Sequence, residues 1–277
     1  MTAAAVETSP RRWRPSLVIQ ASFLLHAVLL GVVGVDPPLW PWVVLILVLN
    51  HLALTALGLW PRSTWLGPNI TRLPPEAAAR GEIALTIDDG PDPAVTPAVL
   101  ALLDQHRVKA TFFCIGAAAE RWPDLCRSIV ERGHTIENHT QHHPLHFAFF
   151  GMRGFTREIS SAQSTLSAIA GRRPRFFRAP AGLRNPLLDP VLAKLGVRLV
   201  AWTARGFDTR TSDAAVVSRR LLQHLKAGSI LLLHDGNSAR SAAGVPVILT
   251  VLPKVLEAAA AQSLRLVTLN EAIPDAS

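Results

Sequence analysis

The feature that most constrains this chain is the stretch between Arg14 and Arg62, in which Asp36 is the only formal charge. It contains two apolar runs, at residues 17–35 and 39–60, separated by an Asp-Pro-Pro sequence that cannot continue a helix. As a helix, each run is long enough to cross a hydrocarbon core of about 30 Å. The stretch therefore favours two consecutive transmembrane helices.

The positions of the tryptophans support a membrane interpretation. Five of the seven lie at the ends of the two runs: Trp13, Trp40, Trp42, Trp60 and Trp65. Aromatic side chains gather at membrane–water interfaces, so this placement is typical of a two-helix hairpin. A single anchor, a cleaved signal peptide and a pair of buried helices in a soluble fold are the alternatives.

Positive charges around the hairpin predict its orientation. Arg11, Arg12 and Arg14 precede the first run, Arg62 and Arg72 follow the second, and the short connection between the runs carries no Lys or Arg. Because positively charged flanks stay on the cytoplasmic side, both ends of the hairpin and the rest of the chain are expected there. This predicts a multi-pass protein of a bacterial-type inner (cytoplasmic) membrane.

After the hairpin, the pattern alternates between strand-like and helix-like segments, which implies a parallel sheet covered by helices. Seven strands in about 200 residues fit a small or incomplete barrel. The expected strands are residues 83–87, 110–115, 135–137, 175–177, 198–202, 229–233 and 265–268, and the expected helices are 96–106, 123–132, 156–170, 186–195, 214–225 and 245–262.

We therefore divide the chain into four parts. Residues 1–16 form a basic tail, residues 17–60 the two transmembrane helices, residues 61–80 a linker with four prolines, and residues 81–277 a single α/β domain.

The net charge of +8 is compatible with nucleic acid, an anionic membrane surface or an anionic substrate. The arginines are scattered, without a basic run interleaved with aromatics, so a nucleic-acid partner is disfavoured. Tyr is absent, which excludes a phenol as acid, base or nucleophile. Cys114 and Cys126 are too few for a disulfide framework and are expected to be buried thiols.

Polar residues gather directly after the predicted strands, which is where active sites form in parallel β/α barrels. Asp88 and Asp89 end the first strand, and His139 and His143 follow the third. A spacing of four residues puts both imidazoles on one face if this stretch is helical. One aspartate and two histidines form a three-ligand site with an open position, the arrangement of catalytic zinc.

Together these motifs resemble the polysaccharide deacetylases, also called the NodB-homology domain or carbohydrate esterase family 4, over about residues 83–268. TIDDG is similar to the family's TFDDG, which implies Asp88 as general base and Asp89 as metal ligand. HTQHHP resembles the family's H-[ST]-x-x-H-P motif, which implies His139 and His143 as the other ligands of a divalent metal, Zn²⁺ by ligand type.

Two later motifs complete the resemblance. RAPAG is similar to R-x-P-[FY]-G; this implies that Arg178 orients Asp88 and that the backbone N–H of Ala181 binds the oxyanion. LLH resembles the L-x-H motif, which implies that Leu232 lines the acetyl pocket and His234 is the general acid. The fold implied is an irregular (β/α)7 barrel.

The chain departs from the family at two substrate-side positions. Ala181 replaces an aromatic ring. In the WTARGFD stretch, which begins at Trp202, Arg205 stands where the family usually has an aspartate that raises the pKa of the acidic histidine. Either Asp208 takes over that role, or Arg205 lowers the pKa of His234 or faces a negatively charged substrate.

We therefore expect a metal-dependent hydrolase of linear amides that removes an N-acetyl group from an acetamido sugar of a membrane glycolipid or lipid-linked precursor. Arg184, Arg205 and Arg210 are candidates to pair with its phosphate. The apolar segment 144–155 either enters the bilayer interface or packs over the barrel. The alternatives are a de-N-acetylase of an envelope polysaccharide (peptidoglycan or chitin-like) with a periplasmic domain, and a non-catalytic sugar-binding membrane protein. Protein partners do not follow from the sequence.

Overall fold

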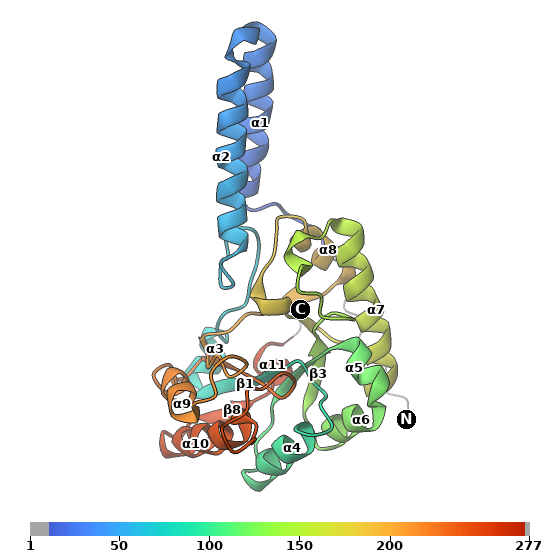
Figure 1. Ribbon diagram of the computed structural model, residues 1–277, viewed down its shortest axis with the longest axis vertical. Coiled ribbons are helices and arrows are strands. Elements are labelled where there is room, and N and C mark those ends of the chain that lie inside the picture. The colour runs from blue at the N-terminus through green and yellow to red at the C-terminus, as the bar shows by residue number, and fades with distance from the viewer. Residues whose placement is uncertain (1–10, 275–277) are drawn as a thin grey trace.

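The computed structural model of the chain describes residues 11–274, so the predictions for residues 1–10 and 275–277 lie outside it. A two-helix hairpin projects along the long axis of the molecule from an α/β body (Figure 1).

The hairpin consists of α1 (Leu17–Val35) and α2 (Trp40–Gly58), joined by the short 3-10 helix η1 (Pro37–Leu39). Both helices are long and apolar enough to cross a membrane, and only 17% and 11% of their most apolar windows are buried. The core helices of a soluble protein would be mostly buried. Between the helices, the Asn50 side-chain amide donates a hydrogen bond to the Ser22 hydroxyl oxygen at 2.9 Å.

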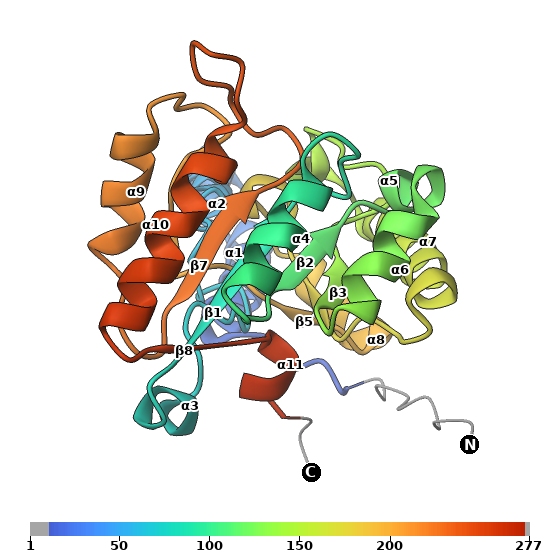
Figure 2. The same cartoon turned by 90° about the horizontal axis from the view of Figure 1, so that it is seen from below.

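The α/β body is built on one parallel sheet that curls into an incomplete barrel with helices outside it, which confirms the predicted fold class (Figure 2). Its strand order is β5-β4-β3-β2-β1-β7-β6, and β8 pairs with β1. The strands are β1 (Glu82–Asp88), β2 (Thr111–Cys114), β3 (Thr135–Asn138), β4 (Phe176–Phe177), β5 (Arg198–Leu199), β6 (Ala204–Arg205), β7 (Ile230–His234) and β8 (Arg265–Val267).

The described residues thus contain eight strands, one more than the seven predicted. The strand expected at 198–202 is only two residues long, β5, and a second two-residue strand, β6, follows after residues 200–203. Strands of two residues leave no alternating pattern to detect, so the sequence could not resolve them.

The six longest helices of the body match the predicted ones within a few residues: α4 (Thr96–Gln105), α6 (Pro123–Glu131), α7 (Met152–Ala170), α8 (Leu188–Leu195), α9 (Ala214–Leu222) and α10 (Val247–Ala261). Five short elements were not predicted because each is too short for a helical period: α3 (Pro75–Ala79), α5 (Gly116–Arg121), α11 (Leu269–Ala272), η2 (Phe147–Phe149) and η3 (Pro180–Gly182).

The alternation of side chains along β1 positions the site. Ile83, Leu85 and Ile87 belong to the large apolar core that also contains residues of the outer helices. The alternate residues Thr86 and Asp88 therefore point to the inside of the barrel. The same alternation in β7 puts Leu231 and Leu233 in the outer core and directs Leu232 and His234 inward.

Residues 61–80, the predicted linker, lie along the open side of the barrel. Ile70 makes a parallel bridge with Val200 just after β5; its N–H donates to the Leu199 carbonyl at 3.0 Å and its carbonyl accepts from the Ala201 N–H at 2.8 Å. Farther along, the Leu73 N–H donates to the Gly228 carbonyl just before β7 at 2.9 Å. The Thr71 carbonyl accepts from the Thr203 hydroxyl, just before β6, at 2.8 Å. The segment is therefore hydrogen-bonded beside both end strands of the sheet, β5 and β6.

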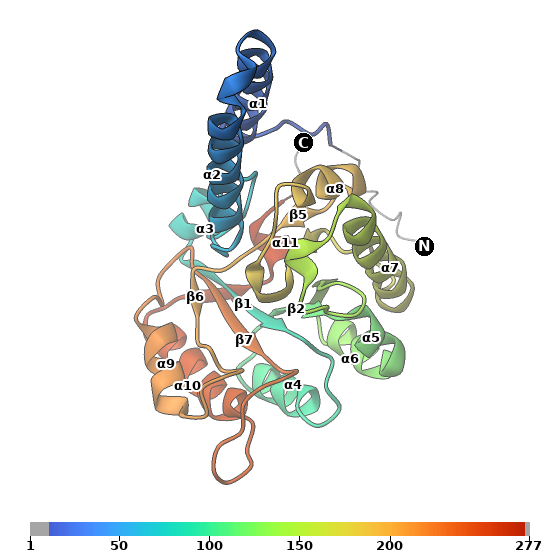
Figure 3. The ribbon, with the colours of Figure 1, turned by 45° about the horizontal axis from the view of Figure 1, so that its top comes forward.

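The end of α2 packs directly on the loop around η3, and Figure 3 shows the two regions meeting below the hairpin. A Cβ atom at Gly58 would overlap the Arg184 carbonyl oxygen, and one at Gly182 would lie 2.7 Å from Pro61 and 2.6 Å from the Trp202 ring. Because these glycines lack a Cβ, the hairpin approaches the barrel closely at this loop.

Candidate active site

Asp88 and His234 end neighbouring strands and are register partners in the β1–β7 ladder. Parallel strands lie about 4.8 Å apart, so the two side chains start from adjacent positions on the same inward-facing side. Asp88 is 2% exposed and His234 5%. The period-2 pattern of two apolar strands thus places a carboxylate beside an imidazole at the mouth of the barrel.

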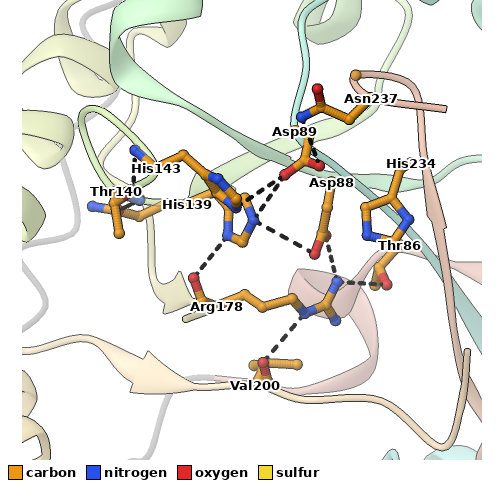
Figure 4. A network of polar contacts seen from close by, with 12 residues as sticks. Thr86, Asp88, Asp89, His139, Thr140, His143, Arg178, Val200, His234 and Asn237 are labelled. Atoms are coloured by element: carbon orange, nitrogen blue, oxygen red, sulfur yellow. Dashed lines mark hydrogen bonds and ion pairs between the residues drawn. The ribbon is translucent and has the colours of Figure 1, made fainter. Parts of the chain in front are cut away.

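Asp89, His139 and His143 form a cluster beside this pair, as Figure 4 shows. The Oδ1 atom of Asp89 lies 3.2 Å from His139 Nε2 and 3.3 Å from His143 Nε2, and the three candidate ligand atoms lie within 4.8 Å of one another. Asp89 Oδ1 is buried and accepts no hydrogen bond from the described residues. One buried carboxylate oxygen facing two imidazole nitrogens fits a divalent cation with an open coordination position.

The two histidines reach the cluster from a loop. Their convergence was predicted on the condition that this stretch is helical, and that condition is wrong. Residues 139–143 contain no helix, and Thr140 and His143 both have left-handed backbone, with φ of 68° and 51°. The Thr140 hydroxyl oxygen accepts a hydrogen bond from the His143 N–H at 2.9 Å and stabilises the turn. Such strained backbone in non-glycine residues is concentrated at functional sites.

The imidazole of His139 is oriented by its second nitrogen. Nδ1 lies 2.8 Å from the Arg178 carbonyl oxygen; a carbonyl only accepts, so Nδ1 carries the proton and Nε2 is left free toward Asp89. Burial opposes charge on His139, but the carboxylates of Asp88 and Asp89 outweigh it and raise its pKa. The same negative field favours a cation in the cluster.

Asp88 is paired with the buried guanidinium of Arg178, whose Nη1 donates to Asp88 Oδ1 at 2.6 Å. Arg178 is fully buried; it also donates to the Thr86 hydroxyl at 2.8 Å and to the Ala201 carbonyl at 2.7 Å. Its guanidinium lies 4.1 Å from the ring centre of Phe113. These contacts hold the carboxylate of Asp88 in one orientation.

Asp208 is hydrogen-bonded to His234 and takes the role that the aspartate replaced by Arg205 has in the family. The two carboxylate oxygens of Asp208 bind His234, at 2.9 Å to Nδ1 and 2.7 Å to the backbone N–H. Burial opposes charge on His234, but the hydrogen bond and the charge of Asp208 outweigh it and raise the pKa of the imidazole. Asp208 is itself fully buried, and its hydrogen bonds orient His234. That Asp208 also contacts the substrate stays a prediction.

Arg205 is the register partner of Leu232 in the β6–β7 ladder. Its guanidinium stacks over the rings of Trp202 and Phe207, at 5.3 and 4.9 Å from their centres, and lines a separate cavity. Of the other arginines predicted near a phosphate, Arg184 is buried and donates to the carbonyls of Ser63 and Gly67 at 2.7 and 3.0 Å. Burial lowers the pKa of Arg184 to about 10, and its role is to hold residues 61–80.

Arg210, the third of those arginines, is exposed and does not line that cavity.

The remaining predicted residues lie around the mouth of the barrel. Leu232 packs with Ala201 and Trp202 in a small apolar cluster. Ala181 is exposed in η3, with a left-handed φ of 53° that is unusual for alanine.

The apolar segment after His143 divides between the two predicted roles. Phe147 and Phe155 are buried and stack against each other at 4.8 Å between ring centres. Leu145 and Phe149 are 94% and 77% exposed. One part of the segment therefore packs over the barrel, and the other part presents two large apolar side chains to the surroundings.

The sequence missed the neighbours that close the other side of the cluster. The Asn237 side-chain amide donates to Asp89 Oδ2 at 3.2 Å, and a cavity of about 360 Å³ beside Asp89 is also lined by Arg121 and Trp122. A Cβ at Gly236 would overlap Asp89, so only glycine allows this approach. Trp122 lies between two helices and far from any strand end, which left no signal for it.

Three comparisons place the chain among known proteins. The family model described as polysaccharide deacetylase matches residues 76–200. A chitooligosaccharide deacetylase of Azorhizobium caulinodans is 39% identical over 158 residues, which cover 57% of this chain and 75% of the relative. A peptidoglycan-N-acetylglucosamine deacetylase of Bacillus cereus is 32% identical over 210 residues, which cover 75% of this chain and 91% of the relative.

Solved structures agree with these matches. The crystal structure of the Bc1960 peptidoglycan N-acetylglucosamine deacetylase superposes with a TM-score of 0.66 at 29% identity, over 74% of this chain and 92% of that one. A family 4 carbohydrate esterase from Streptomyces lividans, in complex with acetate, gives a TM-score of 0.60 at 30% identity, over 67% of this chain and 91% of that one.

Proposed function

This chain belongs to the polysaccharide deacetylase family, as its motifs indicated, and we propose that it removes the N-acetyl group from an acetamido sugar with the help of a divalent metal ion. The observation that carries the proposal is the position of Asp88 and His234 as adjacent strand-end residues beside the cluster of Asp89, His139 and His143. A base and an acid beside a metal site are the groups that amide hydrolysis near neutral pH requires.

In this proposal, Asp89, His139 and His143 hold the metal. Bound there, a divalent ion such as Zn²⁺ supplies a Lewis acid that polarises the amide carbonyl and acidifies water. Asp88 accepts the proton of the attacking water at its carboxylate, and the ion pair with Arg178 holds that carboxylate in place.

Protonated His234 then donates its Nε2 proton to the leaving nitrogen, since an amide nitrogen leaves poorly without a proton. Asp208 supports this step because it raises the pKa of His234 and holds Nδ1. The backbone N–H of Ala181 donates to the developing oxyanion. Leu232 and Trp202 provide the apolar wall for the acetyl methyl group.

The hairpin of α1 and α2 is proposed as a membrane anchor. Its support is the length, the hydropathy and the exposure of both helices, together with tryptophans at their ends. The arginines at both ends support the further proposal that the catalytic domain faces the cytoplasm from a bacterial-type inner membrane. Reporter fusions after residue 277 test the proposed cytoplasmic side. Activity of a reporter that works only in the periplasm would contradict it.

Two substrate classes have separate support. The similarity to a chitooligosaccharide deacetylase and to a peptidoglycan-N-acetylglucosamine deacetylase favours an envelope polysaccharide. The close packing of the end of α2 on the loop that contains Ala181 favours a sugar carried on a membrane lipid, because the site then lies near the lipid headgroups.

The experiment that tests the proposed activity measures acetate released from N-acetylated sugars by the purified full chain. The exposed Asp104→Asn variant is the matched control, because Asp104 forms a surface ion pair with Arg132. We expect Asp88→Asn to lower turnover by roughly 10²–10⁴-fold, and Asp104→Asn to leave it within twofold (~0.4 kcal/mol). Equal acetate release by the wild-type chain and Asp88→Asn contradicts the assignment.

A further inference from the structure

A cavity of about 400 Å³ lies where the hairpin meets the barrel, separate from the cavity beside Asp89. Its walls come from three distant parts of the chain. Trp60 and Arg62 follow α2; Trp202, Arg205 and Phe207 surround β6; and Arg220 projects from α9. Aromatic rings and guanidinium groups are therefore combined in one hollow at the end of a membrane-type helix.

No carboxylate lines this cavity among the described residues, and two of its arginines, Arg62 and Arg220, have only neutral hydrogen-bond partners. Arg62 donates to the Thr203 carbonyl at 3.0 Å. Arg220 donates to the Gly206 carbonyl at 3.2 Å and to the Thr211 hydroxyl at 3.0 Å. Each guanidinium has five N–H donors, so most of their donors remain available.

Arg205 is the most constrained of the three. It is sandwiched by Trp202 and Phe207, and its Nε is buried without a hydrogen-bond partner in the described chain. The nearest carboxylates are already engaged, since Asp88 pairs with Arg178 and Asp208 with His234. A half-buried guanidinium with a free buried Nε donor is a favourable site for an anion, above all for a phosphate that accepts two parallel hydrogen bonds.

The position of the cavity, just beyond the end of a membrane-type helix, also indicates a lipid ligand. Trp60 and Arg62 lie two and four residues beyond the end of α2, which is where headgroup phosphates meet a spanning helix. Trp60 is 55% exposed, as expected for a ring in the interface. Exposed Leu145 and Phe149 form a second apolar point, on the loop that carries the metal-ligand histidines.

The cavity shares a wall with the candidate active site. Arg205 is the register partner of Leu232 in the β6–β7 ladder, and Leu232 precedes His234 by two residues on the inward face of β7. Trp202 contacts Leu232 on one side and lines the cavity on the other. A ligand in the cavity would therefore be separated from the candidate active site only by Trp202 and Leu232.

We propose that this cavity binds the phosphate of a lipid-linked acetamido sugar and so selects a phosphate-bearing substrate over an uncharged glycan. The proposal rests on the proposed deacetylase function and narrows its substrate class. Arg205 supplies a half-buried charge, and Arg62 and Arg220 supply further donors from two other segments. In this arrangement, Arg205 serves substrate recognition and Asp208 serves His234.

The test measures binding in mixed micelles with the full chain in the Asp88→Asn background, so that the result does not depend on turnover. The two probes share one acetamido sugar and one lipid tail, joined through a phosphate diester in one and through an uncharged ether in the other. We compare Arg220→Gln with Arg219→Gln, the neighbouring exposed arginine on α9 that does not line the cavity. A third variant, Arg205→Gln, removes the buried charge.

We expect the phosphate-linked probe to bind about tenfold more tightly than the ether-linked probe. Arg220→Gln and Arg205→Gln should each remove most of this preference, and Arg219→Gln should preserve it. Thermal unfolding midpoints show whether a variant is folded; if Arg205→Gln unfolds, Arg220→Gln and its control decide. A preference that is absent in the parent chain, or equal in Arg220→Gln and Arg219→Gln, overturns the proposal.

A second arm separates the substrate phosphate from bulk lipid. Retention of the chain on vesicles with and without an anionic phospholipid is compared for the same variants. If Arg220→Gln weakens vesicle retention and leaves the probe preference intact, the cavity binds lipid headgroups and the substrate proposal is wrong. Acetate release by the wild-type chain from a soluble phosphate-free sugar reports separately on the deacetylase function, which survives any of these failures.

Discussion

Two groups of charged side chains lie on either side of Trp202 and Leu232, and they are built differently. In the candidate active site, Arg178 pairs with Asp88 and His234 pairs with Asp208, each within 3 Å. In the cavity below the hairpin, Arg62 and Arg220 have only neutral hydrogen-bond partners, and the Nε of Arg205 has none among the described residues.

The difference indicates what each region is for. Paired charges fix orientation and proton affinity, which is what acid–base chemistry needs. Unpaired cations in a partly buried hollow leave binding energy for an incoming anion. Of the four predictions that follow, three test whether the candidate active site depends on its internal pairs and its cation cluster. The fourth tests the close contact between the hairpin and the barrel.

The largest effect is expected from Arg178→Met. The change leaves Asp88 as a buried carboxylate without its partner, and breaking a buried pair in this way costs about 3–5 kcal/mol. Arg132→Met, which breaks the exposed pair with Asp104, should cost no more than about 1 kcal/mol. Thermal and denaturant unfolding of the two variants measures the contrast; similar losses would show that the Arg178 pair is not special.

Asp89→Asn tests the cation site itself. Asparagine tolerates the left-handed backbone at this position, where φ is 73°, so the loop is expected to keep its shape. Loss of the only carboxylate in the cluster should weaken metal binding by more than about 100-fold, because even partners of the ligands contribute 10–100-fold. Metal titration followed by elemental analysis measures this, with Asp92→Asn as the nearby control. Unchanged metal affinity would remove Asp89 from the ligand set.

Asp208→Asn tests the pair that holds the acid. Asp208 raises the pKa of His234, and the proton donor must be protonated, so activity falls as pH rises through that raised pKa. Removing the charge lowers this pKa, and the alkaline limb of the pH–rate profile should move to lower pH. At acidic pH the loss should stay below the roughly 10²-fold cost of removing a general acid. Asp213→Asn, which keeps an N-cap on α9, should leave the profile unmoved.

The smallest effect concerns the attachment of the hairpin. A methyl group at Gly58 would overlap the Arg184 carbonyl oxygen, whereas one at Gly34 in α1 meets nothing within 4 Å. Gly→Ala in a helix normally stabilises by up to about 1 kcal/mol. We therefore expect Gly34→Ala to raise the unfolding midpoint slightly and Gly58→Ala to lower it. A rise in both would mean that the close contact between α2 and the η3 loop has no energetic weight.

The parts of the site that lie on long strands were predictable, because a period of two determines which residues point inward. In β1 this period directs Asp88 to the inside of the barrel, and in β7 it directs His234 to the inside as well. The ligand types were also readable from Asp89, His139 and His143. Their convergence was predicted for a different reason, since a loop with left-handed residues replaces the helical turn.

Other features depend on contacts between distant segments and left no local pattern. The cavity joins Arg62, Arg205 and Arg220, which belong to three different elements. The sequence marked Arg205 as a departure from the family and did not predict its neighbours. The sequence left the partner of His234 undecided for the same reason. Only the fold shows that Asp208 binds both the Nδ1 atom and the backbone N–H of His234.

The hydrogen bonds of Ile70 and Leu73 to both sides of the open sheet have a consequence for modularity. A chimera that exchanges the anchor at residue 81 would leave the backbone next to β5 unpaired, and would lose the edge protection that residues 61–80 provide. Gene fusions and domain shuffling must therefore carry this stretch with the enzyme half. The boundary for recombination lies at the end of α2, before residues 61–80, and not at residue 81, where the predicted α/β domain begins.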